Sequence, residues 1–246
     1  MKIHIPKLLL SSGKVPDEEA LALFQRQWAT YQKLVDADCL SHRQVGEILK
    51  MAVNQNGMES FVFLDLACGD AHLMGQTLSG TKIGLYRGID MSKSALELAA
   101  NNLKDVPFEV ELIQGDFVDA IRRLRSPVDV IFCSLSIHHL KTDEKLELMK
   151  SIRQWTRRFL MIYEPTFADG EDQAGFMSRF SSVNQKIWNM LSVDEWQQIE
   201  HHVRTCDLPE TAQVWEKLGL QAGFSSVKEL FCNPTDFFRV YQYDVT

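Results

Sequence analysis

The chain has 246 residues, 45% of them hydrophobic, which is enough for one domain with a sizeable core. Its formal net charge of -7 disfavours a nucleic-acid partner, and the basic runs at 122–125 and 157–158 lie in helix-like patterns that are expected to face solvent. No apolar stretch approaches the roughly 20 residues that span a bilayer, so no membrane partner is expected.

The N-terminal stretch MKIHIPKLLLSSGKVP does not read as a secretion signal, because Pro6 and Lys7 interrupt its apolar patch. The five cysteines are scattered along the chain and show no CxxC pair that would favour a disulfide framework or a zinc site. Both observations favour a reducing, cytoplasmic compartment.

A leader over residues 1–55 is predicted to be helical. From Leu21 to Val35 apolar residues recur at steps of three and four, which predicts a helix with one buried stripe. A second helix is predicted from Ser41, its N-cap, to about Val53. The leader must pack on the rest of the chain, and we interpret it as part of a lid.

From Phe61 short apolar runs alternate with amphipathic segments, the pattern of βαβ units in a parallel sheet covered on both faces. The predicted strands are FVFLDL, KIGLYRGID, VELIQGD, VDVIFCSL and FLMIYEP. Helices are predicted from about His72 and over SALELAANNL, VDAIRRL and DEKLELMKSIRQW. These segments predict an α/β fold with a doubly wound, Rossmann-like, mostly parallel sheet.

Residues 167–215 interrupt this alternation with helical, aromatic-rich sequence, which we interpret as an insert that forms an acceptor lid. Two more strand candidates, VKELFCN and FFRVYQYD, close the chain, and the short segment between them predicts an antiparallel hairpin. Residues 56–166 and 216–246 would form the core of one structural domain that also includes the leader and the insert.

Ligands of open α/β sheets bind outside the carboxyl ends of the strands, where this sequence places carboxylates. Asp90 closes the second predicted strand 21 residues after Gly69, a spacing that suits hydrogen bonds from both hydroxyls of a ribose. Asp116 follows the third strand and suits an exocyclic adenine amino group, with Phe117 as an apolar wall. Taken singly, each aspartate also fits a helix cap or turn, but their order predicts an adenosine pocket.

The turn after the first strand, in FLDLACGDA, holds one glycine, Gly69, with Ala67 and Ala71 where nucleotide-binding turns often have glycine. Because alanine avoids positive φ, ordinary dihedrals are expected at both alanines. Asp70 would repel a pyrophosphate bound at this turn. The pattern disfavours NAD and favours a cofactor without phosphates.

Over about residues 60–165, and in its closing strands, the chain resembles the class I S-adenosylmethionine-dependent methyltransferases, small-molecule type. FLDLACGDA looks like their first motif, GID like the second and QGDF like the third, and HHL after the fourth strand is similar to many small-molecule members. The resemblance implies S-adenosyl-L-methionine as cofactor. The cofactor-binding residues it implies are Asp65, Ala67, Cys68, Gly69, Asp90, Met91, Asp116, Phe117 and Ser134.

Candidate catalytic residues follow the fourth and fifth strands. This family places acceptor-side residues after the fourth strand, which implies His139 as a base or an acceptor-orienting group, with His138 and Glu164 nearby. The alternative interpretation is that one histidine caps the next helix and that Glu164 pairs with a lysine or arginine.

The pair His201-His202, with Asp207, is a second candidate for the base. No HxH or HxxxH pair with a carboxylate stands out, so no bound metal is expected. Side chains of the leader and the insert are expected to line an apolar acceptor site, unless they form plain core. The predicted acceptor-binding residues are Trp28, Tyr31, Met177, Phe180, Trp188 and His202.

These observations predict a methyltransferase that transfers a methyl group in line to an oxygen, nitrogen or sulfur of a small molecule. The segment SLSIHH is not the Asp/Asn-Pro-Pro-aromatic loop used on amino groups of nucleic-acid bases, which again disfavours nucleic acid. The alternatives are an NAD-dependent Rossmann oxidoreductase and a non-catalytic S-adenosylmethionine-binding protein. A monomer or homodimer is expected.

Overall fold

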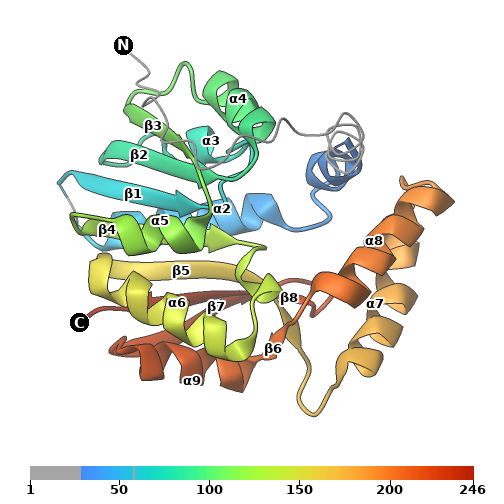
Figure 1. Ribbon diagram of the computed structural model, residues 1–246. Coiled ribbons are helices and arrows are strands. Elements are labelled where there is room, and N and C mark those ends of the chain that lie inside the picture. Colours follow the sequence, from blue (N-terminus) through green and yellow to red (C-terminus); the bar gives the residue numbers. More distant parts are fainter. Residues whose placement is uncertain (1–28, 58) are drawn as a thin grey trace.

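The computed structural model describes residues 29–57 and 59–246, and Figure 1 shows a central sheet flanked by helices. Residues 29–36 are helical, as predicted for the end of the leader helix. Trp28 and the earlier part of that predicted helix lie outside the described residues. Within the described residues, no helix is both long enough and apolar enough to cross a membrane.

The predicted alternation of strands and helices is confirmed. The strands are β1 (Phe61–Leu66), β2 (Ile83–Asp90), β3 (Glu109–Gln114), β4 (Val128–Ser134), β5 (Thr156–Phe167), β6 (Glu210–Thr211), β7 (Ser226–Cys232) and β8 (Phe238–Asp244). The helices are α2 (His42–Gln55), α3 (Met74–Leu78), α4 (Lys93–Asn102), α5 (Phe117–Arg123), α6 (Thr142–Trp155), α7 (Gln173–Ile187), α8 (Val193–Cys206) and α9 (Ala212–Ala222), with a 3-10 turn, η1 (Ile137–His139).

The strand order is β3-β2-β1-β4-β5-β8-β7, and β6 pairs with β5 beside this path. Strands β1 to β5 run parallel, whereas β8 is antiparallel to both β5 and β7. The strand order therefore reverses between β1 and β4, where diverging connections leave room for a ligand. The doubly wound sheet and the closing hairpin agree with the prediction.

Strands β1, β4 and β5 are buried on both faces, which explains their continuous apolar runs. The neighbours Phe63 and Leu64 in β1 belong to two different core clusters, since successive side chains of a strand point to opposite faces. Helices α5, α6 and α9 cover one face, and α2 packs on the other (Figure 1).

The insert predicted over residues 167–215 contains α7 and α8, which pack on each other and stand apart from the helices that cover the sheet (Figure 1). Its predicted end falls inside α9. Trp215 in that helix is fully buried in the same core cluster as Leu148 of α6. Helix α9 thus belongs with the cover of the sheet.

Helix α2 starts one residue after Ser41, so Ser41 occupies the predicted N-cap position. Its φ of 53° is left-handed, however, and its side chain makes no capping hydrogen bond. The carbonyl of Ser41 instead accepts from the backbone N–H of Val45 at 3.0 Å, and the backbone N–H of Arg43 donates to Asp38 at 3.2 Å. The tight turn before α2, not a serine cap, sets the start of this helix.

Candidate functional site

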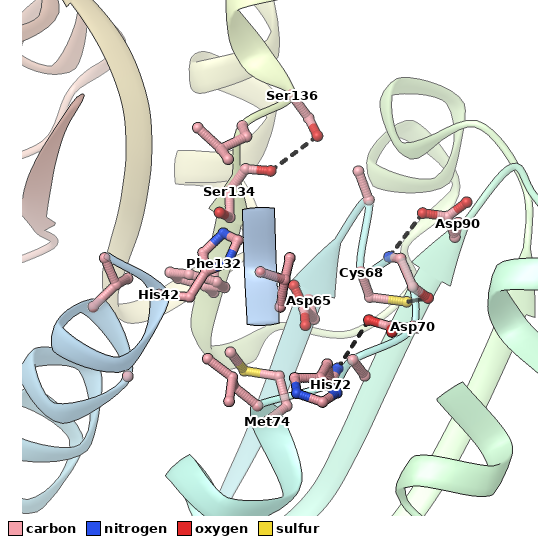
Figure 2. A pocket seen from close by; sticks show the side chains of 18 of the residues that line it. His42, Asp65, Cys68, Asp70, His72, Met74, Asp90, Phe132, Ser134 and Ser136 are labelled. Carbon is pink, nitrogen blue, oxygen red and sulfur yellow. Dashed lines mark hydrogen bonds between the residues drawn. The ribbon is translucent and has the colours of Figure 1, made fainter. Parts of the chain in front are cut away.

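A cavity of about 290 Å³ lies at the carboxyl ends of β1, β2 and β4, where the strand order reverses (Figure 2). Tyr31 and α2 residues, among them His42, close it from the other side. Six of the nine predicted cofactor residues line this cavity: Asp65, Ala67, Cys68, Gly69, Asp90 and Ser134.

The turn after β1 has left-handed backbone at alternate residues, with φ of 54° at Ala67, 54° at Gly69 and 48° at Ala71. The expectation of ordinary dihedrals at the two alanines is wrong. Left-handed backbone costs a non-glycine residue roughly 1–2 kcal/mol, so the surroundings must hold it. The N–H of Cys68 donates to the carbonyl of Ile89, and that of Ala71 to the carbonyl of Cys68, both at 2.9 Å.

Asp90 joins this turn to the loop after β2. One carboxylate oxygen accepts from the N–H of Gly69 at 2.9 Å, and the other accepts from the N–H of Ser92 at 2.7 Å. An ionised carboxylate has about four acceptor positions, so two remain for hydroxyl donors in the cavity. The geometry therefore suits the predicted ribose contact.

Asp65 lies at the floor of the same cavity and is 3% exposed. It accepts a hydrogen bond from the hydroxyl of Tyr86 at 2.7 Å. The pKa of Asp65 is raised to about 7, mainly by burial; the Tyr86 hydrogen bond lowers it and the charge of Asp90 raises it. The carboxyl group is therefore poised to ionise when a cation binds beside it.

Three predicted cofactor residues do not line the cavity. Met91 is 65% exposed, and Phe117 packs against the core cluster on the face of the sheet that α5, α6 and α9 cover. Asp116 caps α5 by accepting from the N–H of Asp119 at 3.0 Å, as the alternative interpretation of a strand-end aspartate allows. Contacts of these three residues with an adenine stay a prediction.

A second cavity, also of about 290 Å³, adjoins the first, and Tyr31 and Leu135 line both. Four of the predicted acceptor residues line it: Tyr31, Phe180, Trp188 and His202. Met177 is buried in the core beside it and does not reach it. The sequence pattern missed Leu34, Leu40 and Leu135, because single leucines carry no signal that separates a cavity wall from core.

Glu164, fully buried at the end of β5, holds the turn that follows β4. Its carboxylate accepts the backbone N–H groups of Ser136, Ile137 and His138, and lies 2.6 Å from His138 Nδ1. The partner of Glu164 is thus His138, not the lysine or arginine of the alternative interpretation. Glu164 orients His138 and does not line either cavity.

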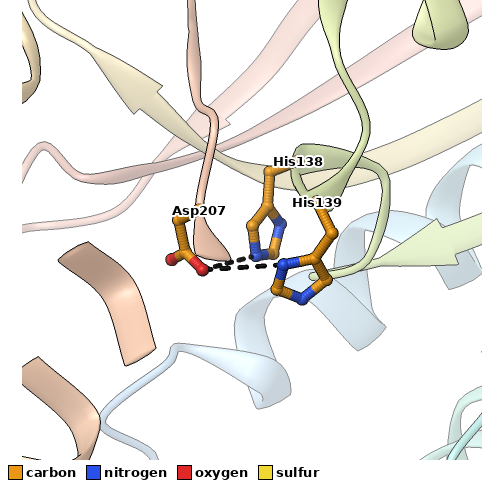
Figure 3. A group of neighbouring side chains, drawn as sticks. All are labelled: His138, His139 and Asp207. Carbon is orange, nitrogen blue, oxygen red and sulfur yellow. Dashed lines mark ion pairs between the residues drawn. The ribbon is translucent and has the colours of Figure 1, made fainter. Parts of the chain in front are cut away.

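Both His138 and His139 line the second cavity, where Asp207 joins them from the chain after α8 (Figure 3). The Oδ1 atom of Asp207 lies 3.5 Å from His138 Nε2, 3.6 Å from His139 Nδ1 and 3.6 Å from His202 Nε2. The structure thus merges the two predicted base clusters into one. His201 is exposed and lines neither cavity.

The pKa values of the adjacent residues His138 and His139 are shifted in opposite directions. Burial favours the neutral ring of His138, but the carboxylates of Glu164 and Asp207 outweigh it and raise the pKa of His138 to about 9. Burial and the neighbouring His138 lower the pKa of His139. His139, with 39% of its side chain exposed, is the more accessible of the two to a molecule in the cavity.

Comparison with known proteins places this site in context. Residues 63–158 match a family model described as a methyltransferase domain. Among characterised proteins, malonyl-[acyl-carrier protein] O-methyltransferase of Halalkalibacterium halodurans is 29% identical over 111 residues. That match spans 44% of this chain and 40% of the relative, so the chain matches less than half of that relative's length.

Solved structures share the fold over most of the chain. Magnesium protoporphyrin IX methyltransferase from Synechocystis PCC 6803, with bound SAH, is 14% identical and superposes with a TM-score of 0.60 over 92% of this chain and 94% of that one. A methyltransferase from Clostridium acetobutylicum gives 14% identity and a TM-score of 0.58 over 90% and 98% of the two chains. Mitomycin 7-O-methyltransferase is 15% identical, with a TM-score of 0.57 over 93% of this chain and 58% of that one.

Proposed function

We propose that this chain is a class I S-adenosylmethionine-dependent methyltransferase, which its matched domain and its fold support, and that it methylates a small molecule in the second cavity. The observation that carries the proposal is the pair of adjoining cavities that share Tyr31 and Leu135. One cavity is lined by strand-end carboxylates and the other by aromatic and histidine side chains. In-line transfer needs a donor and an acceptor held in adjoining sites.

The first cavity fits the cofactor by the chemistry of its lining. S-adenosyl-L-methionine supplies a methyl group on a sulfonium, next to an ammonium and two ribose hydroxyls. Asp65 and Asp90 are suited to the cationic and hydroxyl groups, whereas a pyrophosphate beside Asp65, Asp70 and Asp90 would be repelled. This charge pattern supports S-adenosylmethionine over the NAD-dependent alternative.

The second cavity favours an apolar or flat acceptor, since leucine, phenylalanine and tryptophan side chains form much of its lining. The structural neighbours include methyltransferases of magnesium protoporphyrin IX and mitomycin, which supports a small-molecule acceptor. We place His139 as the base or acceptor-orienting group, with His138 and Glu164 as positioning residues. The helices at 29–36, α7 and α8 would act as the lid.

Calorimetric titration of the purified protein with S-adenosylhomocysteine and, separately, with NADH tests the proposal. We expect micromolar binding of S-adenosylhomocysteine, no binding of NADH, and loss of affinity in Asp90→Ala. Asp90 accepts with both oxygens and asparagine keeps only one acceptor, so circular dichroism must show that the Asp90→Ala variant is still folded. Binding of NADH alone would refute the assignment.

The acceptor can then be sought by incubating the protein with methyl-labelled cofactor and pools of aromatic hydroxyl, amine and thiol compounds. Label transfer identifies the acceptor and the methylated atom. Unchanged kcat/KM in His139→Ala would remove His139 from the transfer step. Cofactor binding without transfer to any metabolite pool would favour the non-catalytic alternative.

A further inference from the structure

Four side chains in the second cavity, His138, His139, His202 and Asp207, form what we call the histidine-aspartate cluster. Their three nitrogen-to-oxygen distances to Asp207 Oδ1 are 3.5, 3.6 and 3.6 Å. These distances lie beyond the usual 2.7–3.2 Å of such hydrogen bonds. Asp207 Oδ1 is buried and has no hydrogen-bond partner among the described residues.

Two of these distances, from Asp207 Oδ1 to His138 Nε2 and to His139 Nδ1, match the edges of a tetrahedral metal site. Metal bonds of about 2.0–2.2 Å in a zinc site place neighbouring ligand atoms roughly 3.3–3.6 Å apart. One ligand atom from each of His138, His139 and Asp207 lies within 4.8 Å of the other two. The distances to Asp207 are therefore wider than hydrogen bonds and fit ligands around one ion. His139 Nδ1 also lies 3.3 Å from the carbonyl oxygen of Cys206, and it would exchange that contact for the metal bond.

Glu164 holds the His138 ring in the orientation that a metal ligand needs. Its carboxylate lies 2.6 Å from His138 Nδ1, so a proton held there leaves the lone pair of Nε2 directed at the cluster. A carboxylate behind a histidine ligand is the usual outer-shell partner of a metal-bound imidazole.

The segment that carries Asp207 is anchored to the same turn. The N–H of Leu208 donates to the carbonyl of His138 at 2.9 Å, and the ammonium of Lys145 donates to the carbonyl of Leu208. Lys145 also pairs with Glu210 at 2.8 Å. The ligands are thus held together by contacts other than those between the ligands themselves.

We propose that His138 Nε2, His139 Nδ1 and Asp207 Oδ1 bind a zinc ion in the second cavity, with His202 at its rim. Two imidazoles and one carboxylate are a donor set that zinc favours, and three protein ligands leave the fourth position open. The three ligands line the same cavity as Tyr31 and Phe180.

The open position gives the zinc a role that rests on the proposed function: it binds an oxygen of the acceptor. A bound zinc ion lowers the pKa of a coordinated hydroxyl, so the acceptor can lose its proton to water near neutral pH. His139 is then a ligand and not the base. The acceptor would then be a molecule with a hydroxyl or other oxygen donor at one end and an apolar body.

The test is zinc binding, measured without any acceptor. The full chain is stripped with a chelator, dialysed and titrated with zinc by calorimetry, with metal content measured independently. We expect one equivalent of zinc, and Co²⁺ in its place should show the intense visible absorption of a tetrahedral site.

His139→Ala is the decisive variant because its side chain is partly exposed, so its loss spares the core. Glu164→Gln removes an outer-shell partner and should lower zinc affinity by ~10–100-fold. The ligand variants His139→Ala and Asp207→Asn should each lower zinc affinity by more than that. His201→Ala is the matched control, since His201 is an exposed histidine next to His202 on α8. Circular dichroism and S-adenosylhomocysteine affinity report whether each variant is folded.

Less than one equivalent of bound zinc in the folded protein would overturn the site. Unchanged affinity in His139→Ala, or an equal loss in His201→Ala, would do the same. Binding of S-adenosylhomocysteine without zinc would leave the methyltransferase proposal standing with His139 as base. Zinc binding without S-adenosylhomocysteine would instead refute the proposed function and keep the metal site.

Discussion

Single carboxylates in the first cavity serve the fold and the proposed cofactor site at once. Asp90 accepts two backbone N–H groups and still faces the cavity, and Asp65 is held by Tyr86. Asp116 stands at the corresponding place after β3, but its side chain caps α5. The role of each aspartate therefore depends on which backbone groups surround it, and substitution can separate the roles.

Cofactor affinity should depend on pH through Asp65. The pKa of Asp65 in the folded protein is raised to about 7, so the group is mainly protonated below that pH. Because an ammonium group favours the ionised form, affinity for S-adenosylhomocysteine should rise as pH increases from about 5.5 to 8. Calorimetry across this range measures it, and Asp65→Asn should remove the dependence.

The raised pKa of Asp65 also affects the free energy of unfolding. Its contribution to stability falls as pH rises, whereas the expected cofactor affinity rises. A buried acid whose pKa is raised contributes most below its unfolded value, about 3.9, and loses that contribution as pH rises through about 7. Asp65→Asn should therefore gain stability relative to the natural protein between pH 5 and 8 in denaturant titrations. A constant difference across this range would show that Asp65 stays ionised.

Asp116 offers a test that separates a helix cap from an adenine contact. Asp116→Ala should lower the free energy of unfolding by about 0.5–2 kcal/mol, the usual cost of losing an N-cap. Asp116→Asn keeps a capping oxygen and should be nearly as stable. If Asp116→Asn also weakens S-adenosylhomocysteine binding, measured by calorimetry, the residue contacts the adenine; if it does not, the cap is its whole role.

At the level of elements, the turn between β4 and α6 decides where the catalytic candidates lie. Leu135 has a left-handed φ of 51°, and the next three residues, Ser136 and the first two of η1, direct their N–H groups at Glu164. The neighbouring strand β5 thus positions His138 and His139 through one buried carboxylate. This dependence explains how Glu164, which lines neither cavity, can influence the candidate catalytic residues.

Glu164→Gln should destabilise the protein strongly. Hydrogen bonds to a charged group contribute about 1.5–3 kcal/mol each, and a glutamine amide cannot accept at both ends, so we expect a loss of at least ~2 kcal/mol. Thermal and denaturant unfolding measure it. The matched control is Glu147→Gln, an exposed glutamate paired with Lys150, which should change stability by less than about 1 kcal/mol.

On the scale of the whole molecule, segments far apart in sequence enclose the second cavity. The leader is tied to α8 by Lys33, whose ammonium lies 2.6 Å from Glu195. Tyr31 from the leader and Leu135 from the turn after β4 separate the two cavities. The lid interpretation therefore predicts that residues of the shared wall couple cofactor and acceptor binding.

Two variants test that coupling. Tyr31→Ala should weaken S-adenosylhomocysteine binding, because Tyr31 lines both cavities, and should raise the KM for an identified acceptor. Phe180→Ala opens only the second cavity, so it should raise that KM and leave S-adenosylhomocysteine affinity, measured by calorimetry, within about twofold of the natural protein. If both variants alter cofactor affinity equally, Phe180 acts as general core.

The order of strands and helices followed from the sequence alone, because hydrophobic periodicity is local and the strands buried on both faces read as continuous apolar runs. The carboxylates at strand ends were also accessible, since parallel strands bring their carboxyl ends to one edge. Only the tertiary structure decided the backbone of Ala67 and Ala71, where surrounding hydrogen bonds outweigh the preference of alanine. It likewise decided the cluster of His138, His139, His202 and Asp207, because packing of the insert against the turn after β4 joins side chains that no short motif connects.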